Sequence, residues 1–379
     1  MVNKINVKNT GVAINMDNTY RKFKVGVLGG TGFVGQRFIC LLKDHPWFEV
    51  ACIAASERSA GKSYKEAVSN RWKLNIPMPL YAEEILVKNV NQVDEICNKV
   101  DFVFCALDMQ KEEIVALEEM YAKAETPVIS NNSANRWTPD IPMVIPEINP
   151  EHIAIIEKQR KRLGSKKGFI AVKPNCSIQS YVPAMHPLMI YDPEKIIVCT
   201  YQAISGAGKV FSDWPEINDN VIPYIGGEED KSEKEPLKIW GRIENGEIVK
   251  AQRPVISSQC YRVPVSEGHM AAVSVSFAKK PLKEDIIETW KNFKGKPQIL
   301  NLPSAPKHFL KYFEENDRPQ TRLDRDYENG MGISIGRLRE DPVFDYKFAA
   351  LSHNTIRGAA GGAVLIAELL VSEGYLEKK

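Results

Sequence analysis

The sequence lacks three features that would each point to a particular class of protein. Its seven cysteines include no Cys-x-x-Cys pair, so neither a zinc site nor a redox dithiol is indicated. Its 50 Lys and Arg nearly balance its 48 Asp and Glu, and a net charge of +2 gives no electrostatic reason to expect nucleic acid or a membrane surface as partner. No apolar run approaches the roughly 18 residues that span a bilayer.

The cysteines that are present are mostly found in apolar runs. This is typical of reduced core thiols in a cytoplasmic protein, and it holds for Cys40, Cys52, Cys97, Cys105 and Cys199. Residues 1–22 are polar and lack the apolar stretch of a signal peptide, so we expect an N-terminal extension there and a cytoplasmic location.

Length and pattern predict two domains. A chain of 379 residues with 44% hydrophobic residues can form two cores. Strands and helices alternate up to about residue 150, which predicts a Rossmann-type α/β domain, whereas longer strands with few helices follow from residue 196. We therefore expect a nucleotide-binding domain at 23–174 and an α+β domain with a largely antiparallel sheet at 175–352. A helix at 353–379, rich in Ala and Gly, would return to the first domain.

A glycine-rich loop follows the first apolar strand, which we expect at residues 23–28. The sequence Gly-x-Gly-x-x-Gly, with its glycines at 30, 32 and 35, leads into a helical pattern from residue 33. Such glycines allow a tight turn and bring the backbone close to a pyrophosphate, which rests on the helix N-terminus. A plain turn is the alternative, but the strand before, the helix after and a second strand at 48–55 favour a dinucleotide site. Its predicted contacts are Gly30, Thr31, Gly32, Phe33 and Val34.

The residues after the second strand bear on the choice of cofactor. An acidic residue there would bind the ribose hydroxyl of NAD, whereas an arginine accommodates the 2′-phosphate of NADP. Ser56, Arg58 and Ser59 form a plausible phosphate pocket, although Glu57 could face the ribose instead. The pattern favours NADP.

Cys176 differs from the other cysteines. It follows a Pro-Asn turn after an expected strand at 168–172 and opens a plausible helix at 177–190. Free N–H groups and the helix dipole would stabilise a thiolate there, and exposure with a lowered pKa would suit a covalent catalyst. An inert packing thiol is the alternative.

Four further segments resemble signature segments of the aspartate-semialdehyde dehydrogenases, in the family's order. They are residues 174–177 (PNCS), 201–208 (YQAISGAG), 262–269 (RVPVSEGH) and 354–360 (NTIRGAA). With the glycine loop they span residues 23 to about 373, and the archaeal and fungal form of the enzyme is the best match.

The resemblance implies a covalent mechanism. Cys176, preceded by Asn175, would attack an acyl phosphate, L-4-aspartyl phosphate, expel phosphate and leave a thioester. NADPH would reduce it to L-aspartate 4-semialdehyde, a step in lysine, threonine and methionine biosynthesis. His269 would be the general acid/base and Gln202 would orient the substrate or hold the oxyanion. A hydrogen-bonded structural role is the alternative for each of the last two.

The resemblance also implies residues that bind the anionic substrate. Arg262 would hold the carboxylate bidentately. It lies seven residues before His269, so the chain between them must turn if both are to reach one substrate. Arg136 and Lys238 would bind phosphate and Glu235 the amino group, but residues 226–238 are so charged that an irregular surface run is an alternative. Ser205, Gly206 and Asn354 would complete the cofactor site.

Two other functions share this pattern. An NADPH-dependent reductase of a coenzyme A thioester, such as malonyl-CoA, would keep Cys176, His269 and Arg262 but would need no phosphate site. An inactive relative that only binds nucleotide would not need the cysteine, glutamine, arginine and histidine together. We expect no metal, and the resemblance implies a homodimer or homotetramer.

Overall fold

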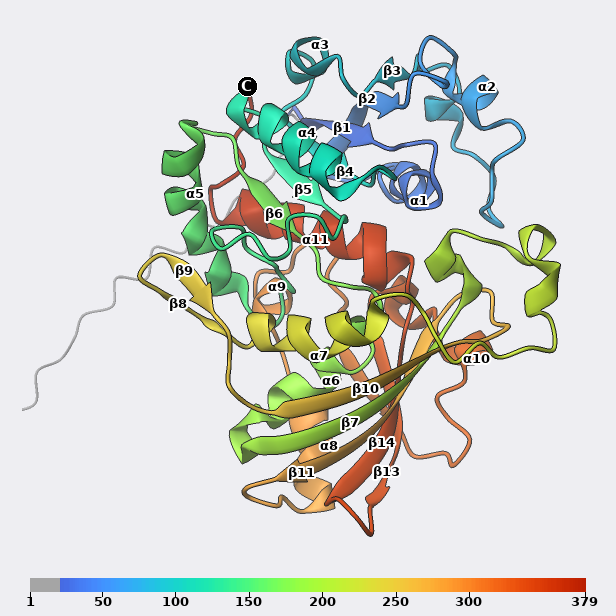
Figure 1. Cartoon of the computed structure of the whole chain (residues 1–379), viewed down its shortest axis with the longest axis vertical. Helices are drawn as coiled ribbons and strands as arrows, with labels where there is room; N and C mark the ends of the chain where they lie inside the picture. Colours follow the sequence, from blue (N-terminus) through green and yellow to red (C-terminus); the bar gives the residue numbers. More distant parts are fainter. Residues whose placement is uncertain (1–20) are drawn as a thin grey trace, which may run out of the picture.

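A computed structural model describes residues 21–379, so all but the last two residues of the expected extension 1–22 lie outside the described part of the chain. The described residues form two six-stranded sheets. Figure 1 shows the first sheet, with its helices, above the second. No helix in the described residues is long and apolar enough to cross a membrane.

The first sheet is parallel throughout and has the order β3-β2-β1-β4-β5-β6. Strands β4, β5 and β6 are short apolar runs buried on both faces, as expected where helices cover both sides. This is the doubly wound order of a dinucleotide-binding domain, which confirms the predicted fold class. The strands are β1 (Phe23–Leu28), β2 (Phe48–Ala55), β3 (Lys88–Asn89), β4 (Phe102–Cys105), β5 (Val128–Ser130) and β6 (Ile170–Val172).

Helices from both ends of the chain cover this sheet. The C-terminal helix α11 packs in one apolar cluster with β1 and α1, through residues such as Leu365 and Leu369, so the chain returns to the first domain after the second is complete. Small residues open α11, and ten of its twelve residues are buried. The helices of this domain are α1 (Phe33–Leu41), α2 (Tyr64–Val68), α3 (Val93–Cys97), α4 (Lys111–Lys123), α5 (Ile156–Leu163) and α11 (Gly361–Ser372).

The second sheet has the order β10-β7-β11-β14-β13-β12. Its three inner pairs are antiparallel and its two outer pairs parallel, so the expected, largely antiparallel sheet is confirmed. Helices α6 and α8 cover one face. The strands are β7 (Pro193–Gln202), β10 (Val255–Arg262), β11 (His269–Phe277), β12 (Leu310–Phe313), β13 (Ile333–Glu340) and β14 (Tyr346–Ser352), and the helices are α6 (Val182–Met185), α8 (Lys283–Asn292), α9 (Lys296–Ile299) and α10 (Thr321–Asp324).

Helix α7 (Glu228–Ile239) lies between the two sheets and packs on β10 (Figure 1). It is followed by a small hairpin, β8 (Arg242–Glu244) and β9 (Glu247–Val249). The alternative interpretation of residues 226–238, an irregular surface run, is wrong. One face of α7 is buried, because Glu228, Ser232 and Glu235 recur at helical spacing and meet polar partners.

Two expected elements differ in the structure. The helix expected at 177–190 is broken into a 3-10 turn at Ser177–Gln179, the single turn of α6 and a second 3-10 segment at His186–Tyr191. Pro183 and Pro187 remove backbone donors and disrupt a continuous helix. The strand expected at 261–265 is instead the end of β10, which runs from Val255 to Arg262. Pro264 lies just beyond this end. The alternating polar residues of β10 hid the earlier part of the strand from the sequence pattern.

Candidate active site

The loop after β1 is shaped by its glycines. Gly29 adopts a positive φ of 82°, which favours glycine. At Gly35 a Cβ atom would lie 2.2 Å from the carbonyl oxygen of Gly29, so only glycine lets α1 pack this close to the loop. Gly32 caps α1, whose first N–H groups are therefore available to an anion.

A cavity of about 360 Å³ lies beside this loop, at the carboxyl end of β2. Ser56, Glu57 and Arg58 line it together with Thr31 and Gly32. The predicted contact Ser59 does not line the cavity. It is buried behind the wall, where its hydroxyl accepts a hydrogen bond from Arg71 at 3.1 Å.

Arg71 is a functional candidate that the sequence did not reveal. It lines both this cavity and a second one of about 600 Å³, and so adds a guanidinium between the two. Arg71 lies in an irregular segment thirteen residues after Arg58, where no local pattern marks it. The two arginines give the cleft the positive charge that a phosphate ester needs.

The second cavity connects the glycine loop to the second domain. Its lining includes Phe33 and Val34 at the start of α1, Asn131 after β5, and Gly206 on the loop that follows β7. Ser205 and Asn354 do not line this cavity. The Asn354 amide donates to Ser205 Oγ at 2.9 Å and accepts from the Gly268 N–H at 2.8 Å, so it fixes two loops around the cleft. Gly30 packs inward, and its carbonyl accepts a hydrogen bond from Tyr64.

Cys176 lies at the entrance to the 3-10 turn, partly buried, and its side chain meets His269. The distance from Cys176 Sγ to His269 Nε2 is 3.6 Å. The expectation of a lowered pKa at an exposed helix start is not met. Burial raises the pKa of the Cys176 thiol, and the negative charge of Glu228 raises it further. The positive charges of Lys173, Arg136 and Arg262 act in the opposite direction.

The hydrogen bonds of His269 define its tautomer. The backbone N–H of Ala203 donates to His269 Nδ1 at 3.1 Å. A backbone N–H can only donate, so Nδ1 is unprotonated and the ring proton lies on Nε2, facing the sulfur. Burial, and then the charge of Arg262, lower the pKa of His269 to about 3. The neutral ring is therefore suited to donate from Nε2 and not to act as a base at that atom.

Three strand ends bring the other predicted catalytic groups together. Gln202 ends β7 directly beside Arg262 at the end of β10, and His269 begins β11 on the other side. The segment between Arg262 and His269 makes the turn that the spacing required, with Gly268 at a φ of 102°. A side chain at Gly206 would lie 2.9 Å from Arg262 NH1 and 3.0 Å from His269 Nε2, so this glycine leaves room where the two tips converge.

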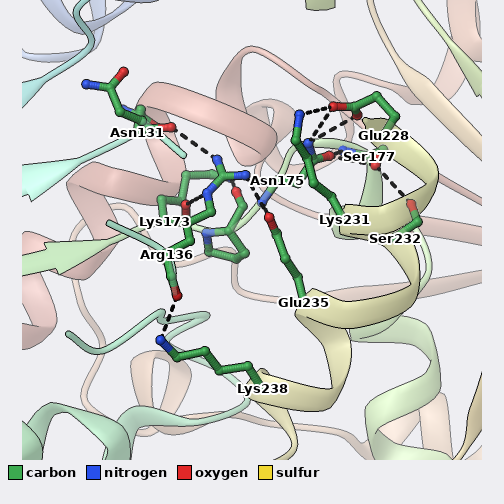
Figure 2. Close-up of polar contacts among 12 residues, drawn as sticks. Asn131, Arg136, Lys173, Asn175, Ser177, Glu228, Lys231, Ser232, Glu235 and Lys238 are labelled. Atoms are coloured by element: carbon green, nitrogen blue, oxygen red, sulfur yellow. Dashed lines mark hydrogen bonds and ion pairs between the residues drawn. The ribbon is translucent and has the colours of Figure 1, made fainter. Parts of the chain in front are cut away.

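Two carboxylates of α7, those of Glu228 and Glu235, point toward Asn175 (Figure 2). Glu228 accepts hydrogen bonds from the amides of Asn175 (3.0 Å) and Gln202 (3.2 Å), and from the ammonium of Lys231 at 2.7 Å. Glu235 accepts from the backbone N–H of Asn175 at 2.6 Å. Asn175 therefore joins β6 to α7 beside Cys176.

Glu228 and Lys231 were missed by the sequence analysis. The signal was available, because Glu228-x-x-Lys231 repeats the spacing Glu235-x-x-Lys238 seven residues earlier, which places both glutamates on one helix face. The expectation of an irregular run at 226–238 hid that periodicity.

The two predicted phosphate ligands differ in what they can still bind. Arg136 pairs with Glu235 at 2.8 Å and donates to the carbonyl oxygens of Lys173 and Asn131 (Figure 2). Lys238 turns away from this cluster, because its ammonium donates to the carbonyls of Arg136, Thr138 and Ile141 at 2.6, 3.3 and 3.2 Å. All three of its donors are used, so in this structure Lys238 has none left for phosphate. Burial lowers the pKa of Lys238 to about 8.

Family models cover both domains. Residues 24–156 match the semialdehyde dehydrogenase NAD binding domain, and residues 185–357 match the semialdehyde dehydrogenase dimerisation domain. The first match runs from β1 to beyond β5, and the second contains every strand of the second sheet.

Curated relatives and solved structures agree with these models. Aspartate-semialdehyde dehydrogenase of Aspergillus fumigatus is 42% identical over 94% of this chain and 99% of its own length. The enzyme of Archaeoglobus fulgidus is 43% identical over 93% of this chain and 99% of its own. The structure of the Candida albicans enzyme with NADP has a TM-score of 0.84 at 40% identity, covering 94% of this chain and all of that one. The predicted resemblance is confirmed, and the chain belongs to the aspartate-semialdehyde dehydrogenase family.

Proposed function

We propose that this enzyme reduces L-4-aspartyl phosphate to L-aspartate 4-semialdehyde with NADPH, through a thioester on Cys176. The observation that carries the proposal is the contact of Cys176 with His269 beside the convergent ends of Gln202 and Arg262. It joins a nucleophile, a proton donor and a carboxylate ligand at the edge of a cleft suited to a dinucleotide. The proposed place of the reaction is lysine, threonine and methionine biosynthesis.

The cleft fits NADP in its charge and its backbone geometry. The pyrophosphate would rest on the N–H groups at the start of α1, near Thr31 and Gly32, where no side chain at the helix cap obstructs it. Arg58, with Ser56 beside it and Arg71 opposite, would hold the 2′-phosphate. The Candida albicans enzyme has been solved with NADP, and we extend that cofactor to this chain.

The first half of the reaction forms the thioester. The Cys176 thiolate attacks the acyl carbon, a C–S bond forms, and the bond from that carbon to the phosphate oxygen breaks, so phosphate leaves with the bonding electrons. Arg262 fixes the substrate carboxylate, and Gln202 orients the acyl group next to the sulfur. The Nε2 proton of His269 faces the sulfur and can donate to the oxygen that becomes negative in the tetrahedral species.

The second half reduces the thioester. NADPH, held by the glycine loop and Arg58, would supply the hydride that the acyl carbon needs. His269 again holds its Nε2 proton against the oxygen of the resulting tetrahedral species. When the C–S bond breaks, the sulfur leaves as a thiolate beside Lys173, Arg136 and Arg262, whose positive charges oppose the effect of burial.

The phosphate site involves Arg136 and a lysine of α7. Arg136 is buried next to Cys176, although Glu235 occupies one of its donors. Lys231 lies one turn before Glu235 on α7 and pairs with Glu228, which is itself bonded to Asn175 and Gln202. The Lys231 side chain is 30% exposed. The role of Lys238 stays a prediction from the family resemblance, whereas the contacts favour Lys231.

A substrate panel tests this function. The unmodified protein should oxidise aspartate semialdehyde with NADP only when phosphate or arsenate is present. Reduction of malonyl-CoA with NADPH is the matched alternative, since that reaction needs no phosphate. Oxidation at full rate without phosphate, or efficient use of malonyl-CoA, would replace the proposed function by the coenzyme A reaction.

We also propose that the enzyme forms a homodimer through the second sheet. The face of this sheet opposite α6 and α8 exposes Ile197 (44%), Tyr201 (40%) and Val255 (65%) on neighbouring strands β7 and β10. A face of this kind is typical of an interface, and the matching family model is described as a dimerisation domain. Ile197→Asp should give monomers in light scattering, whereas Val343→Asp on an exposed turn should not. A dimer that persists in Ile197→Asp would exclude this face.

A further inference from the structure

Lys173 is a buried cation beside the proposed nucleophile. It follows β6 directly and is only 2% exposed. Within the described residues its ammonium has a single hydrogen-bond acceptor, the carbonyl oxygen of Pro174 at 2.7 Å, and no carboxylate partner. A lysine buried with so few acceptors is costly when charged, because its ammonium needs three.

The side chains of Lys173 and Cys176 pack against adjacent turns of the same segment. A Cβ atom on Gly358 would lie 2.9 Å from Cys176 Cβ, and a Cβ atom on Gly362 would lie 3.0 Å from Lys173 Cε. These glycines lie four residues apart, one in the π-helical segment Ile356–Ala360 and one in α11. They leave space for both side chains, so Lys173 and Cys176 pack against the same C-terminal segment.

The other cations around the thiol already have partners. Arg136 pairs with Glu235, Arg357 forms a two-fold ion pair with Glu147, and Arg262 donates to the carbonyl of Ala203 at 2.6 Å. In the described part of the chain, Lys173 and Arg262 are therefore the cations near Cys176 without an ion-paired carboxylate, and of the two only lysine can lose its proton.

The charges around Lys173 and Cys176 couple their ionisation. The pKa of Lys173 is lowered to about 7, mainly by burial; the charge of Cys176 opposes this, the charges of Arg136 and Arg357 add to it, and Glu235 opposes it. Lys173 in turn lowers the pKa of Cys176 against the effects of burial and Glu228. Each group thus favours the charged form of the other.

The remaining neighbours cannot accept the proton of the thiol. His269 already carries a proton at Nε2, and its Nδ1 is held by the Ala203 N–H. Arginine does not change its protonation in proteins, and Glu228 is engaged by Asn175, Gln202 and Lys231. The amine of Lys173 is the group left for this task.

We propose that Lys173 is the charge partner of Cys176, and that the proton lost when the thiol ionises ends on the Lys173 amine. The S–H bond breaks, an N–H bond forms, and the pair remains neutral overall, so no net charge is created in the buried site. Lys173 acts through Cys176 and is a positioning residue. The proposal rests on Cys176 being the nucleophile of the proposed function.

The pH dependence of alkylation at Cys176 tests the proposal without substrate. The rate with iodoacetamide would be followed by peptide mass spectrometry, because Cys40 and Cys199 are also partly exposed. In Lys173→Met the pKa of Cys176 should rise, so the inflection moves to higher pH and the rate near pH 7.5 falls by about 10-fold, as for one pKa unit. Lys238→Met, another buried lysine, should keep the unmodified profile. An unchanged profile in Lys173→Met would overturn the proposal.

A reciprocal measurement applies if Lys173→Met does not fold. The Lys173 amine can be titrated by NMR of labelled lysine side chains, with its signal assigned from its loss in Lys173→Arg. Because coupling is mutual, Cys176→Ala should move the titration of Lys173 to lower pH. A titration that is the same in Cys176→Ala and the unmodified protein would exclude the pair. Neither experiment depends on turnover, so failure of the substrate panel would reject the proposed function separately.

Discussion

The nucleotide cleft and the buried reaction site are built in different ways. The cleft is lined by the loops that follow four neighbouring strands, β1, β2, β3 and β4, together with Arg71. The reaction site is formed by side chains from β6, β7, β10, β11 and α7, most of them charged or amide groups that bond to one another before any substrate binds.

This difference predicts how each region responds to substitution. In the cleft a lost contact should weaken cofactor binding and leave the fold intact. In the reaction site a lost partner leaves another buried group without its ion pair or hydrogen bond, which costs folding stability as well as activity.

Cys176→Ala should reduce turnover by more than about 1,000-fold, because the covalent route is lost. Binding of NADP, measured by fluorescence or calorimetry, should change little, since the thiol contacts the reaction site and not the glycine loop. Substantial activity in this variant would exclude the covalent mechanism. A large loss of NADP affinity would show that the two regions are not independent.

Glu235→Gln should lower the free energy of unfolding by about 3 kcal/mol, the scale for breaking a buried ion pair from one side. The reason is that Arg136, 6% exposed, would remain charged without its carboxylate. Asp230→Asn on the exposed face of α7 is the control, and should change the free energy by less than about 0.5 kcal/mol. Urea unfolding of both proteins would decide, and equal effects would contradict the cost assigned to breaking the buried ion pair.

Arg58→Ala should weaken NADP binding by about 1.5–3 kcal/mol, the value of a charge-assisted hydrogen bond, and leave NAD binding nearly unchanged. Arg71→Met should weaken it in the same direction, with an added effect on Ser59, whose hydroxyl it now contacts. Glu57→Gln is the neighbouring control. Equal affinities for NADP and NAD in the unmodified protein would show that Glu57 faces the ribose.

Lys231→Met should raise the KM for phosphate by about 10-fold with little change in the KM for aspartate semialdehyde, because one partly exposed cation is lost from one of the two anion sites. Lys238→Met is the matched comparison. Its ammonium bonds to three carbonyls, so its loss should lower stability more than phosphate affinity. The opposite ranking of KM values would restore the phosphate role that the family resemblance gives to Lys238.

The same contrast explains what the sequence could predict. Local sequence patterns were sufficient to predict the glycine loop, β1, β2 and the cofactor residues near them, because these features depend on neighbours in sequence. Cys176 stood out by its turn after a strand, whereas Gln202, Arg262 and His269 could be named only because each lies in a segment resembling a known family.

What was missed depends on contacts between distant segments. Arg71 reaches the cleft because of the path of an irregular segment. Glu228 reaches the reaction site because α7 packs against Asn175 and Gln202. The thiol's pKa was expected to fall, yet burial raises it, and one of the segments packed against Cys176 is the C-terminal segment around Gly358, nearly two hundred residues away. The prolines that interrupt residues 177–190 were visible, but their effect was underestimated.

The proposed mechanism requires that an acyl group is carried on Cys176 and released by phosphate. Mass spectrometry of the protein mixed with aspartate semialdehyde and NADP, without phosphate, should show an aspartyl adduct on the peptide that contains Cys176. Addition of phosphate should remove the adduct and restore steady formation of NADPH. Steady NADPH formation without phosphate and without an adduct, or an adduct on a residue other than Cys176, would contradict the claim.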